Sequence, residues 1–427
     1  MSVSFSIEEL KRAWFAASRD AANDFVFDFI RHDDVRFNLD NVLRRLAREL
    51  AAGLYKPSPL MTVEVPKSAY TVRPGAVIPF EDLVVLYAVL LRVAPALDKH
   101  LSPSVFSYRF PPGDFVAGGE EGAAPLPLEY TGAEGSTPYG TPLNPTPWFE
   151  GWARYHHQSL AAAKRYSFCA AGDVTAFFEN TPTRALCDRL AELAEPRFAE
   201  DIAFLKYLFD IWGWTGSSGP ADSLLPQGND VSLFLSNFYL IELDAAMEEL
   251  ARGDASRYMR YVDDFRFFTN EESEGHKALL LADGVLRRNR LSLQTVKTGV
   301  SPSASVFDWE VERWLEGMSD VAADPLRTAR DFLTSEYNVR DAERWERVYQ
   351  RALSCLSAAG DDSASHLALE TFLQHPTYKL LLKNFAYLRP LAHLRPLGRE
   401  LAERLEEKVF TFPFHRMYLC LLYTSPS

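Results

Sequence analysis

Apolar residues recur at helical spacing in several stretches of the chain, separated by capping and turn residues. Ser6-Ile7-Glu8-Glu9 is a capping box, which predicts a helix that begins there and runs to about residue 30. A second helix is predicted from near Asn38 to a cap at Gly53, with apolar positions Leu39, Val42, Leu43, Leu46 and Leu50. Further helices are predicted over residues 81–96, over 148–163 and, beyond residue 320, over the amphipathic positions Trp345, Val348, Tyr349, Ala352, Leu353 and Leu356.

Other stretches alternate in polarity or are continuously apolar, as strands are. Residues 61–66 predict one strand, and a second would deliver Asp173 at its end. The run 257–268 places β-prone segments on both sides of Asp263-Asp264, which predicts a β-hairpin with these aspartates at its tip. Between the two, Pro226-Gln227-Gly228 opens a predicted helix whose core face would carry Phe234, Phe238, Ile241 and Ala245. The mixture of elements indicates the α+β class.

The composition is that of a globular protein. The chain has 427 residues, 47% of them hydrophobic and 13% aromatic, which is enough for two or three domains with a large core. No apolar run is long enough to span a bilayer, and the N-terminus lacks a signal pattern. We therefore expect no membrane association. The four cysteines show no paired spacing, so we also expect reduced thiols and a cytoplasmic protein. They are Cys169, Cys187, Cys355 and Cys420.

The charge is strongly negative, at −13. Part of the excess lies in residues 111–150, a Pro/Gly/Ser/Thr-rich segment without Lys or Arg that is predicted to be a long surface loop. Proteins that bind phosphate backbones usually carry a positive surplus. If this chain binds nucleic acid, we expect a narrow basic channel on an acidic surface, and modest, salt-sensitive binding of generic nucleic acid.

The adjacent aspartates carry the candidate chemistry. Asp263 and Asp264 repel each other, and a divalent cation between them would offset that cost. Mg²⁺ suits the site because it takes oxygen ligands and keeps positions for phosphate oxygens. Taken alone, the pair is equally typical of an ordinary turn between two strands.

Six segments together resemble reverse transcriptases, in the order of that family, over roughly residues 35–300. The Tyr-Val-Asp-Asp box at 261–264 resembles the family signature, and residues 166–180, with Asp173, resemble the upstream metal-binding strand. The others are Leu225–Ser232 with its Pro-Gln-Gly loop, the fingers-like segments 65–67 and 73–82, and the later palm segment 291–298 with its lysine. Val105–Arg109 also resembles the segment that closes the fingers.

The resemblance implies a right-hand polymerase fold of α+β class, with an antiparallel palm sheet. Its expected parts are an N-terminal helical region (1–60), fingers (61–165, including the acidic loop 111–150), a palm (166–320) and an α-helical, repeat-like C-terminal domain (321–427). Leu388-Arg389-Pro390-Leu391 recurs as Leu394-Arg395-Pro396-Leu397, which is a weak sign of helical repetition.

The resemblance also implies a catalytic site for two Mg²⁺ ions, with Mn²⁺ as an alternative. Asp173 and Asp263 would be the main ligands, joined by the backbone carbonyl of Val174, and Asp264 would support the charge of the site. Lys297 matches the lysine thought to give a proton to the leaving pyrophosphate; the alternative is a surface lysine at a helix end.

Five further residues match the family's nucleotide-binding positions. Lys67 and Arg73 would bind the triphosphate, although either residue taken alone would more often be a solvated surface cation. Gln227 and Gly228 would contact the incoming nucleotide and the template. Phe178 would exclude a 2′-hydroxyl, which implies deoxynucleotide substrates, whereas its neighbour Phe177 is assigned to the core.

Two features favour the bacterial defence-associated lineages, namely the abortive-infection-like and unknown-group enzymes. One is Arg266 directly after the Tyr-Val-Asp-Asp-Phe core, together with Arg73-Pro74 at the start of a fingers motif. The other is the series of helices predicted after residue 320. The expected function is RNA-directed DNA synthesis in anti-phage defence, with deoxynucleotides, an RNA template (a dedicated non-coding RNA is one candidate) and a DNA product as partners. Homo-oligomerisation stays open.

Several alternatives remain open at this point. They are a template-independent or tyrosine-primed DNA polymerase of the same lineage, a group II intron or retron enzyme, and a non-catalytic RNA-binding scaffold. An RNA-dependent RNA polymerase is a further alternative, against which Phe178 speaks. The ending at residues 421–427 resembles translated sequencing-adapter read-through, which would leave the natural C-terminus missing; a natural short tail is the other interpretation.

Overall fold

The structure is a computed structural model that describes residues 1–23, 35–66, 72–110, 148–212, 225–319, 322–335 and 342–359. Contacts group the chain into two units. The first comprises Met1–Thr62 and Gly75–Val306, and the second comprises Val63–Pro74 and Phe307–Ser427. The four-part division expected from the sequence stays a prediction.

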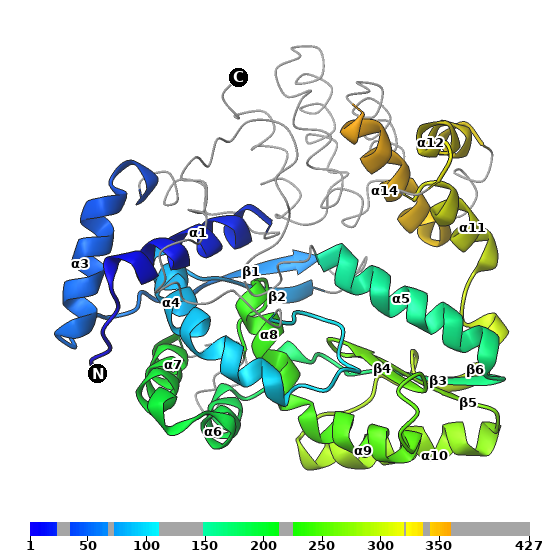
Figure 1. Ribbon diagram of the computed structural model, residues 1–427, viewed down its shortest axis with the longest axis horizontal. Helices are drawn as coiled ribbons and strands as arrows, with labels where there is room; N and C mark the ends of the chain where they lie inside the picture. Colours follow the sequence, from blue (N-terminus) through cyan, green and yellow to red (C-terminus); the bar gives the residue numbers. More distant parts are fainter. Residues whose placement is uncertain are drawn as a thin grey trace. The chain divides into compact units, whose positions relative to one another are not determined.

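The first unit is built around a four-stranded antiparallel sheet (Figure 1). Its spatial order is β4-β5-β3-β6, with bounds β3 Phe168–Asp173, β4 Tyr258–Tyr261, β5 Asp264–Thr269 and β6 Gly299–Pro302. Helices α9 (Ile241–Ala251) and α10 (Glu272–Arg288) cover one face, and α5 (Trp148–Arg165) covers the other. The mixed α+β class and the antiparallel sheet are therefore confirmed.

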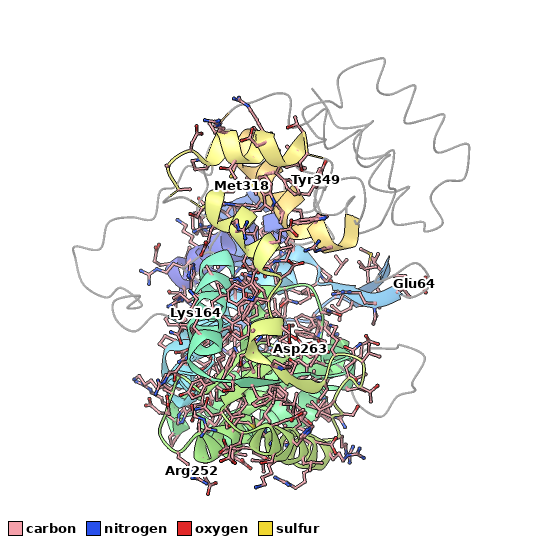
Figure 2. The ribbon with its side chains drawn as sticks, turned by 90° about the vertical axis from the view of Figure 1, so that its right-hand side faces the viewer. Glu64, Lys164, Arg252, Asp263, Met318 and Tyr349 are labelled. Carbon is pink, nitrogen blue, oxygen red and sulfur yellow. The ribbon has the colours of Figure 1, made fainter. Side chains whose placement is uncertain are left out.

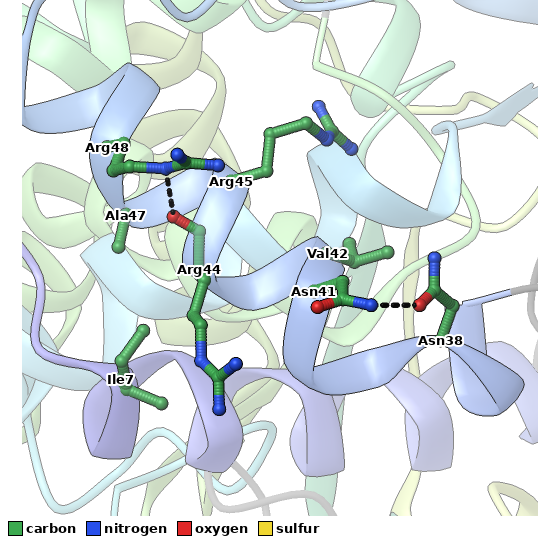
Figure 3. Close-up of a pocket in the computed structure, with 8 residues that line it drawn as sticks. All are labelled: Ile7, Asn38, Asn41, Val42, Arg44, Arg45, Ala47 and Arg48. Carbon is green, nitrogen blue, oxygen red and sulfur yellow. Dashed lines mark hydrogen bonds between the residues drawn. The ribbon is translucent and has the colours of Figure 1, made fainter.

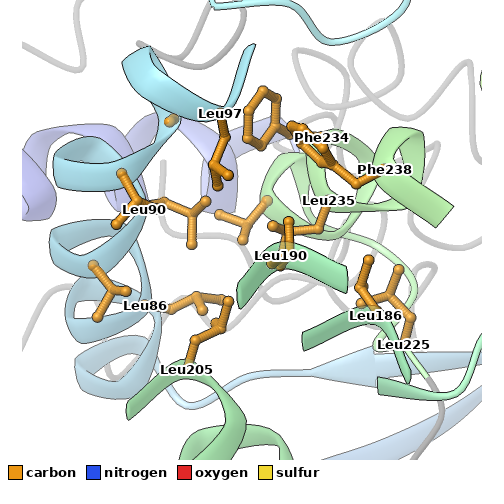
Figure 4. Close-up of a cluster of buried hydrophobic side chains, with 14 of the residues drawn as sticks. Leu86, Leu90, Leu97, Leu186, Leu190, Leu205, Leu225, Phe234, Leu235 and Phe238 are labelled. Atoms are coloured by element: carbon orange, nitrogen blue, oxygen red, sulfur yellow. The ribbon is translucent and has the colours of Figure 1, made fainter. Parts of the chain in front are cut away.

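A helical core packs beside the sheet. Its helices are α4 (Phe80–Leu97), α6 (Thr183–Leu193), α7 (Ala199–Trp212) and α8 (Asp230–Tyr239). Almost every residue of α4 is buried, which is typical of a helix surrounded by other elements. The cluster in Figure 4 joins these helices through Leu86, Leu90, Leu97, Leu186, Leu190, Leu205, Leu225, Phe234, Leu235 and Phe238. Each such side chain contributes roughly 1.5–3 kcal/mol when it is fully buried. The short 3₁₀ helices of this unit are η1 (Asp98–His100), η2 (Phe178–Asn180), η3 (Pro196–Phe198) and η4 (Ser303–Ser305).

The predicted N-terminal helices are present. Helix α1 spans Ile7–Asn23, and its capping box is formed: the Ser6 amide donates to the Glu9 carboxylate at 2.8 Å, and the Glu9 amide donates to Ser6 Oγ at 3.2 Å. The predicted extension to about residue 30 lies outside the described residues. Helix α3 spans Leu39–Ala51, and Gly53 follows it with a φ of 67°, the left-handed conformation expected of a C-terminal cap.

One predicted helical face is wrong. The helix after the Pro-Gln-Gly loop ends at Tyr239, and α9 begins at Ile241 with a changed phase. Leu240 lies between them with φ −102° and ψ 7°, outside helical geometry. Phe234 and Phe238 are buried as expected, but Ala245 is exposed. Leu243 and Met247 take the core positions of α9, because the break at Leu240 rotates its apolar face.

Strands β1 (Met61–Pro66) and β2 (Val72–Val77) pair as a separate two-stranded sheet. The second unit includes the parts of these strands within Val63–Pro74. Its helices are α11 (Trp309–Gly317), α12 (Pro325–Leu333) and α14 (Ala342–Ala358). All six predicted apolar positions of α14 are buried, which confirms its amphipathic pattern. Asp308 caps α11 and accepts hydrogen bonds from Arg344 of α14. The repeated Leu-Arg-Pro-Leu motif and the end of the chain lie outside the described residues.

Among the helices that the structure describes, none is both long and apolar enough to cross a membrane. Three of the four cysteines fall in the described ranges, and each of these is a free thiol, as expected: Cys169, Cys187 and Cys355.

Candidate active site

Three aspartates from neighbouring strands come together at one end of the central sheet. Strand β3 ends at Asp173, whose register partner on β5 is Asp264. Directly opposed residues of an antiparallel pair have Cα atoms about 4.5–5.5 Å apart and side chains on the same face. Asp263 occupies the turn immediately before Asp264, and Figure 2 labels it there. The hairpin and the strand ending at Asp173 were both predicted from the sequence, and both elements are confirmed. The predicted tip is off by one residue, because the turn is Val262-Asp263 and Asp264 is the first residue of β5.

The hairpin turn is tight and strained. Tyr261 pairs with Asp264, so Val262 and Asp263 alone form the turn. Val262 has a φ of 56°, a left-handed conformation that a β-branched residue rarely adopts and that costs roughly 1–2 kcal/mol. Ala176, shortly after Asp173, also has a positive φ, of 45°. Strained backbone of this kind persists where surrounding contacts fix it, and such positions cluster at functional sites.

The backbone at Val174 is oriented towards the hairpin. The Gln294 amide donates to the Asp173 carbonyl at 2.8 Å, and the Thr175 amide donates to the Ser292 carbonyl at 2.9 Å. These bonds flank the isolated bridge between Val174 and Leu293, which is therefore a non-hydrogen-bonded pair. In such a pair the carbonyl points away from the partner segment, so that of Val174 faces the side of the hairpin.

The carboxylates have strongly perturbed protonation. Burial raises the pKa of Asp263 to about 7, and the negative charges of Asp264 and Asp173 add to the effect. Burial also raises the pKa of Asp264 to about 6, followed by the charge of Asp173, while Lys297 and Arg266 oppose the rise. Partly buried acids that repel one another carry excess negative charge, and such perturbed groups are typical of functional sites.

Lys297 lies at the same cluster. Its Nζ donates to Asp173 Oδ2 at 2.7 Å. Burial lowers the pKa of Lys297, but the bond to Asp173 and the charges of all three aspartates outweigh this and raise it overall. The segment before it is a bridge and a turn, so Lys297 is not at a helix end. The structure thus brings together four predicted site residues: Asp173, Asp263, Asp264 and Lys297.

The donor set suits a hard divalent cation. Carboxylate and carbonyl oxygens are the ligands that Mg²⁺ and Mn²⁺ take, and the raised pKa values mark negative charge that a cation would neutralise. Within the described part of the chain, no three His, Cys, Asp or Glu side chains already stand in an arrangement that holds a metal ion. The residues that would hold it are Asp173, Asp263, Asp264 and the carbonyl of Val174.

Phe178 lies at the start of η2, close after Asp173 in sequence. Its side chain is 8% exposed, and its ring packs edge-on against Phe177 with centroids 5.5 Å apart. Phe177, which we assigned to the core, is buried, with 2% of its surface exposed. The two adjacent aromatic rings are therefore alike in burial. Burial does not distinguish the expected sugar-contacting role of Phe178 from the core role of Phe177, so an activity measurement is needed.

The Pro-Gln-Gly loop is held on both sides. The Ala76 amide donates to the Gln227 carbonyl at 3.0 Å. Gly228 has a φ of 136°, which favours glycine, and Asn229 caps α8 by accepting from the Ser232 amide at 2.8 Å. These hydrogen bonds hold the loop at the N-terminus of α8, and both Gln227 and Gly228 are half-buried.

The structure does not test the two predicted triphosphate-binding cations. Lys67 lies outside the described residues. Arg73 is half-buried on β2 and belongs to the second unit, whereas the aspartates belong to the first. The roles assigned to both stay predictions.

A buried polar network behind the hairpin was missed by sequence reasoning. Arg260 is fully buried and donates to both carboxylate oxygens of Asp244, at 2.7 and 2.6 Å. Its Nη1 also donates to the Val262 carbonyl at 2.7 Å. The available signal was an arginine in the middle of an otherwise apolar strand, which has to find a buried acid or destabilise the sheet.

Gly172 was also missed. A Cβ atom built at this position would lie 2.4 Å from the ring of Phe265, its register partner on β5. The ring therefore packs over the glycine backbone beside Asp173. The absence of a side chain lets β3 and β5 place their aspartates opposite each other without displacing this aromatic residue.

A surface hollow of about 690 Å³ lies between α1 and α3 (Figure 3). Its lining includes arginines and asparagines, and two of the arginines that line it pair with carboxylates. Arg45 pairs with Glu81 and Glu49, and Arg44 lies 3.9 Å from Asp40. No carboxylate lines the hollow, so it offers no arrangement comparable to the three aspartates at the end of β3 and β5.

Comparisons with known proteins do not extend this description. A scan against models of known protein families finds no match to this chain, and a search of curated proteins finds no relative. Any assignment of function therefore depends on the motifs and on the geometry of the residues themselves.

Proposed function

We propose that this chain is an RNA-directed DNA polymerase that adds deoxynucleotides to a primer with the help of two divalent metal ions. One observation carries the proposal: Asp173 and Asp264 are register partners, Asp263 occupies the turn beside them, and Lys297 bonds to Asp173. The order and identity of the surrounding motifs, which resemble those of reverse transcriptases, support the substrate class.

The carboxylates have no evident structural use. Each stays partly withdrawn from water beside like charges, which destabilises the fold unless a cation compensates. Metal ions, when bound, activate the primer 3′-hydroxyl and neutralise charge on the leaving pyrophosphate. The protein's own contribution is to hold the oxygen ligands at fixed positions, and most of the rate enhancement would come from positioning and electrostatics.

Lys297 supplies a proton in this proposal. The primer oxygen forms a bond to the α-phosphorus, the bond from that phosphorus to the pyrophosphate oxygen breaks, and the ammonium of Lys297 protonates the leaving group. The 3′-hydroxyl proton passes to solvent. Lys297 suits this role because its side chain is 59% exposed and so can leave Asp173 when substrate arrives.

The direct test is metal-dependent extension of a labelled primer on an RNA template. The parent should extend the primer, and Asp263→Asn should lose at least about 10³-fold in kcat, because a charge that acts on the transition state is removed. Asp283→Asn is a matched control, since this acid lies on α10 and pairs with its neighbour Arg287. A folded, inactive parent on every template and primer offered would remove the polymerase proposal.

The sugar preference has its own test. Phe178→Val should raise the ratio of ribonucleotide to deoxynucleotide incorporation by about 10–100-fold, because a smaller side chain admits a 2′-hydroxyl. Phe177→Val is the matched control, since both rings are buried and packed together. Equal ratios in the two variants would contradict the assignment of Phe178.

The anti-phage role rests on the lineage resemblance at Arg73-Pro74 and Arg266 and on the helices after residue 320. Phage plating on cells that carry the parent or Asp263→Asn tests it: protection should require the intact aspartate.

The priming mode is tested with purified parent protein and labelled deoxynucleotides. Label that stays on the protein band after nuclease digestion would favour tyrosine priming over a nucleic-acid primer.

A further inference from the structure

The turn that presents Asp263 is held from both sides by buried side chains. The Val262 amide donates to Ser107 Oγ at 2.8 Å, and the Val262 carbonyl accepts from Arg260 Nη1 at 2.7 Å. Ser107 and Arg260 are both fully buried. The strained residue of the turn therefore has each of its backbone polar groups fixed by a side chain rather than by water.

The guanidinium that holds the turn is itself immobilised. Asp244 of α9 accepts two hydrogen bonds from Arg260, and Asn237 Oδ1 of α8 accepts a third at 3.0 Å. The planar fork of an arginine paired at both ends has little freedom to rotate. Tyr258 adds a hydrogen bond from its hydroxyl to Asp244 at 2.7 Å, which fixes the carboxylate in turn.

Asn237 closes the network between the two holding groups. Its amide donates to the Ser107 carbonyl at 2.9 Å, and its Oδ1 accepts from the Ser107 hydroxyl at 3.2 Å. The loop that contains Ser107 also pairs with the edge of β4. The Arg260 amide donates to the Ser104 carbonyl, and the Phe106 amide donates to the Arg260 carbonyl. The network thus ties two helices and a loop to one turn.

We infer that Ser107, Asn237, Asp244 and Arg260 form a positioning network that sets the direction of the Asp263 carboxylate. Stability alone does not explain it, because well-packed apolar side chains generally replace a buried ion pair without loss. What apolar side chains cannot supply is a directional bond to each backbone group of Val262. The network controls where Asp263 lies; it touches no substrate. The catalytic consequence rests on the proposed polymerase function, but the placement of the turn does not.

The experiment compares two double variants of the full chain. Arg260→Met with Asp244→Leu removes the ion pair behind the turn while leaving neither of its charges buried and unpaired. The control is Arg257→Met with Glu274→Leu, which removes an ion pair from the other end of the same hairpin. Ser107→Ala is a second, smaller test, because it removes the acceptor for the Val262 amide and the hydroxyl's bond to Asn237 but leaves the ion pair in place.

The first readout is amide hydrogen exchange, which needs neither metal nor substrate. Protection of the peptide that contains residues 260–264 should fall at least about 10-fold in the Arg260/Asp244 variant, while the rest of the sheet keeps its protection.

The second readout is Mn²⁺ affinity, measured by electron paramagnetic resonance without nucleotide. It should fall about 10-fold, because groups behind metal ligands typically change metal affinity by this much. The Arg257/Glu274 control should match the parent in both.

The third readout, after hydrogen exchange and Mn²⁺ affinity, is steady-state polymerisation. The Arg260/Asp244 variant should lose about 10–100-fold in kcat with little change in KM for the nucleotide, as expected when a catalytic group is misplaced and nucleotide binding is unaffected. The inference is overturned if the variant folds and keeps the parent's exchange pattern, or if protection falls evenly over the sheet. An inactive parent with a localised loss of protection would remove the polymerase proposal but support the positioning network.

Discussion

Two groups of charged side chains meet the same hairpin, formed by β4 and β5, and differ in how they are compensated. Asp244, 2% exposed, shares both oxygens with the guanidinium of Arg260, and the pair is neutral. At the turn, three aspartates share the charge of Lys297, whose side chain is 59% exposed, and that of Arg266. The first group is complete within the protein, whereas the second has an excess of negative charge.

The difference separates a carboxylate that stabilises one geometry from the carboxylates that we propose to be catalytic. A compensated buried charge lowers the energy of one particular geometry, so its effect is on shape. An uncompensated cluster raises the energy of the ligand-free fold and creates affinity for a cation from outside. Substituting one acid in each group should therefore move stability in opposite directions, and the predictions below test that contrast.

The largest effect is expected at Asp244. Asp244→Asn leaves the Arg260 guanidinium buried without a counter-ion, so the free energy of unfolding should fall by about 3–5 kcal/mol. Urea denaturation monitored by fluorescence measures the change. Removing the cation as well, in Arg260→Met with Asp244→Leu, should recover most of the loss. A single variant as stable as the parent would show that the pair is not the compensated group described above.

Gly172→Ala should destabilise the fold by about 1–3 kcal/mol, because the new methyl group overlaps the packed ring of Phe265. Gly299→Ala on the neighbouring strand β6 is a matched control. A Cβ atom there meets nothing within 4 Å, and its effect should be near zero or slightly stabilising. If Gly172→Ala lost no more stability than Gly299→Ala, the strands β3 and β5 would be free to move apart. The aspartates would then not be held in close register.

Gly172 also illustrates what the sequence could not reveal. The strand that ends at Asp173 and the hairpin around Asp263 follow from local apolar patterns, and both were predicted. The ring over Gly172 and the bonds between Ser107 and Val262 join residues far apart in the chain, and no local period encodes them. The role of Asn237 has no local signal either, because its partners Ser107 and Arg260 come from other elements.

Helix phase was the other limit. The apolar positions after Gln227 are compatible with one continuous helix, and this interpretation placed Ala245 in the core. The break at Leu240 contains neither Gly nor Pro, so the sequence offers no stop signal there. The motif order indicated which aspartates meet, but the arrangement of Arg73 relative to them is a tertiary property that the pattern of residues does not fix.

Asp263→Asn should stabilise the ligand-free protein at pH 8. Because the pKa of Asp263 is raised to about 7, the folded state binds a proton more tightly than the unfolded state, and stability falls as pH rises from about 4 towards 7. Asparagine removes this penalty. Since Asp263 is only half-buried, the gain should be on the order of 1–2 kcal/mol above pH 7 and should vanish near pH 4.

Thermal unfolding across this pH range measures the Asp263 effect. If the proposed metal site is correct, the parent should regain stability when Mg²⁺ is added at pH 8, and the Asn variant should respond less, since one proposed metal ligand has been removed. Asp283→Asn, at a surface acid in an ion pair with Arg287, should differ from the parent by no more than about 0.5 kcal/mol at any pH. A gain that is the same at pH 4 and pH 8 would contradict an origin in charge repulsion.

The smallest effect is expected for Lys297→Gln, and its sign is opposite. At pH 8 the ammonium of Lys297 offsets part of the aspartate repulsion, so its loss should lower stability, by less than about 1 kcal/mol because the side chain is exposed. Below about pH 4, Asp263 and Asp264 hold protons, so the difference in stability between Lys297→Gln and the parent should shrink. Lys206→Gln, which breaks a single surface pair with Asp188, should show no comparable change between about pH 5 and 8. Matching pH profiles for the two lysines would place Lys297 among ordinary surface cations and leave the cluster without its resident counter-charge.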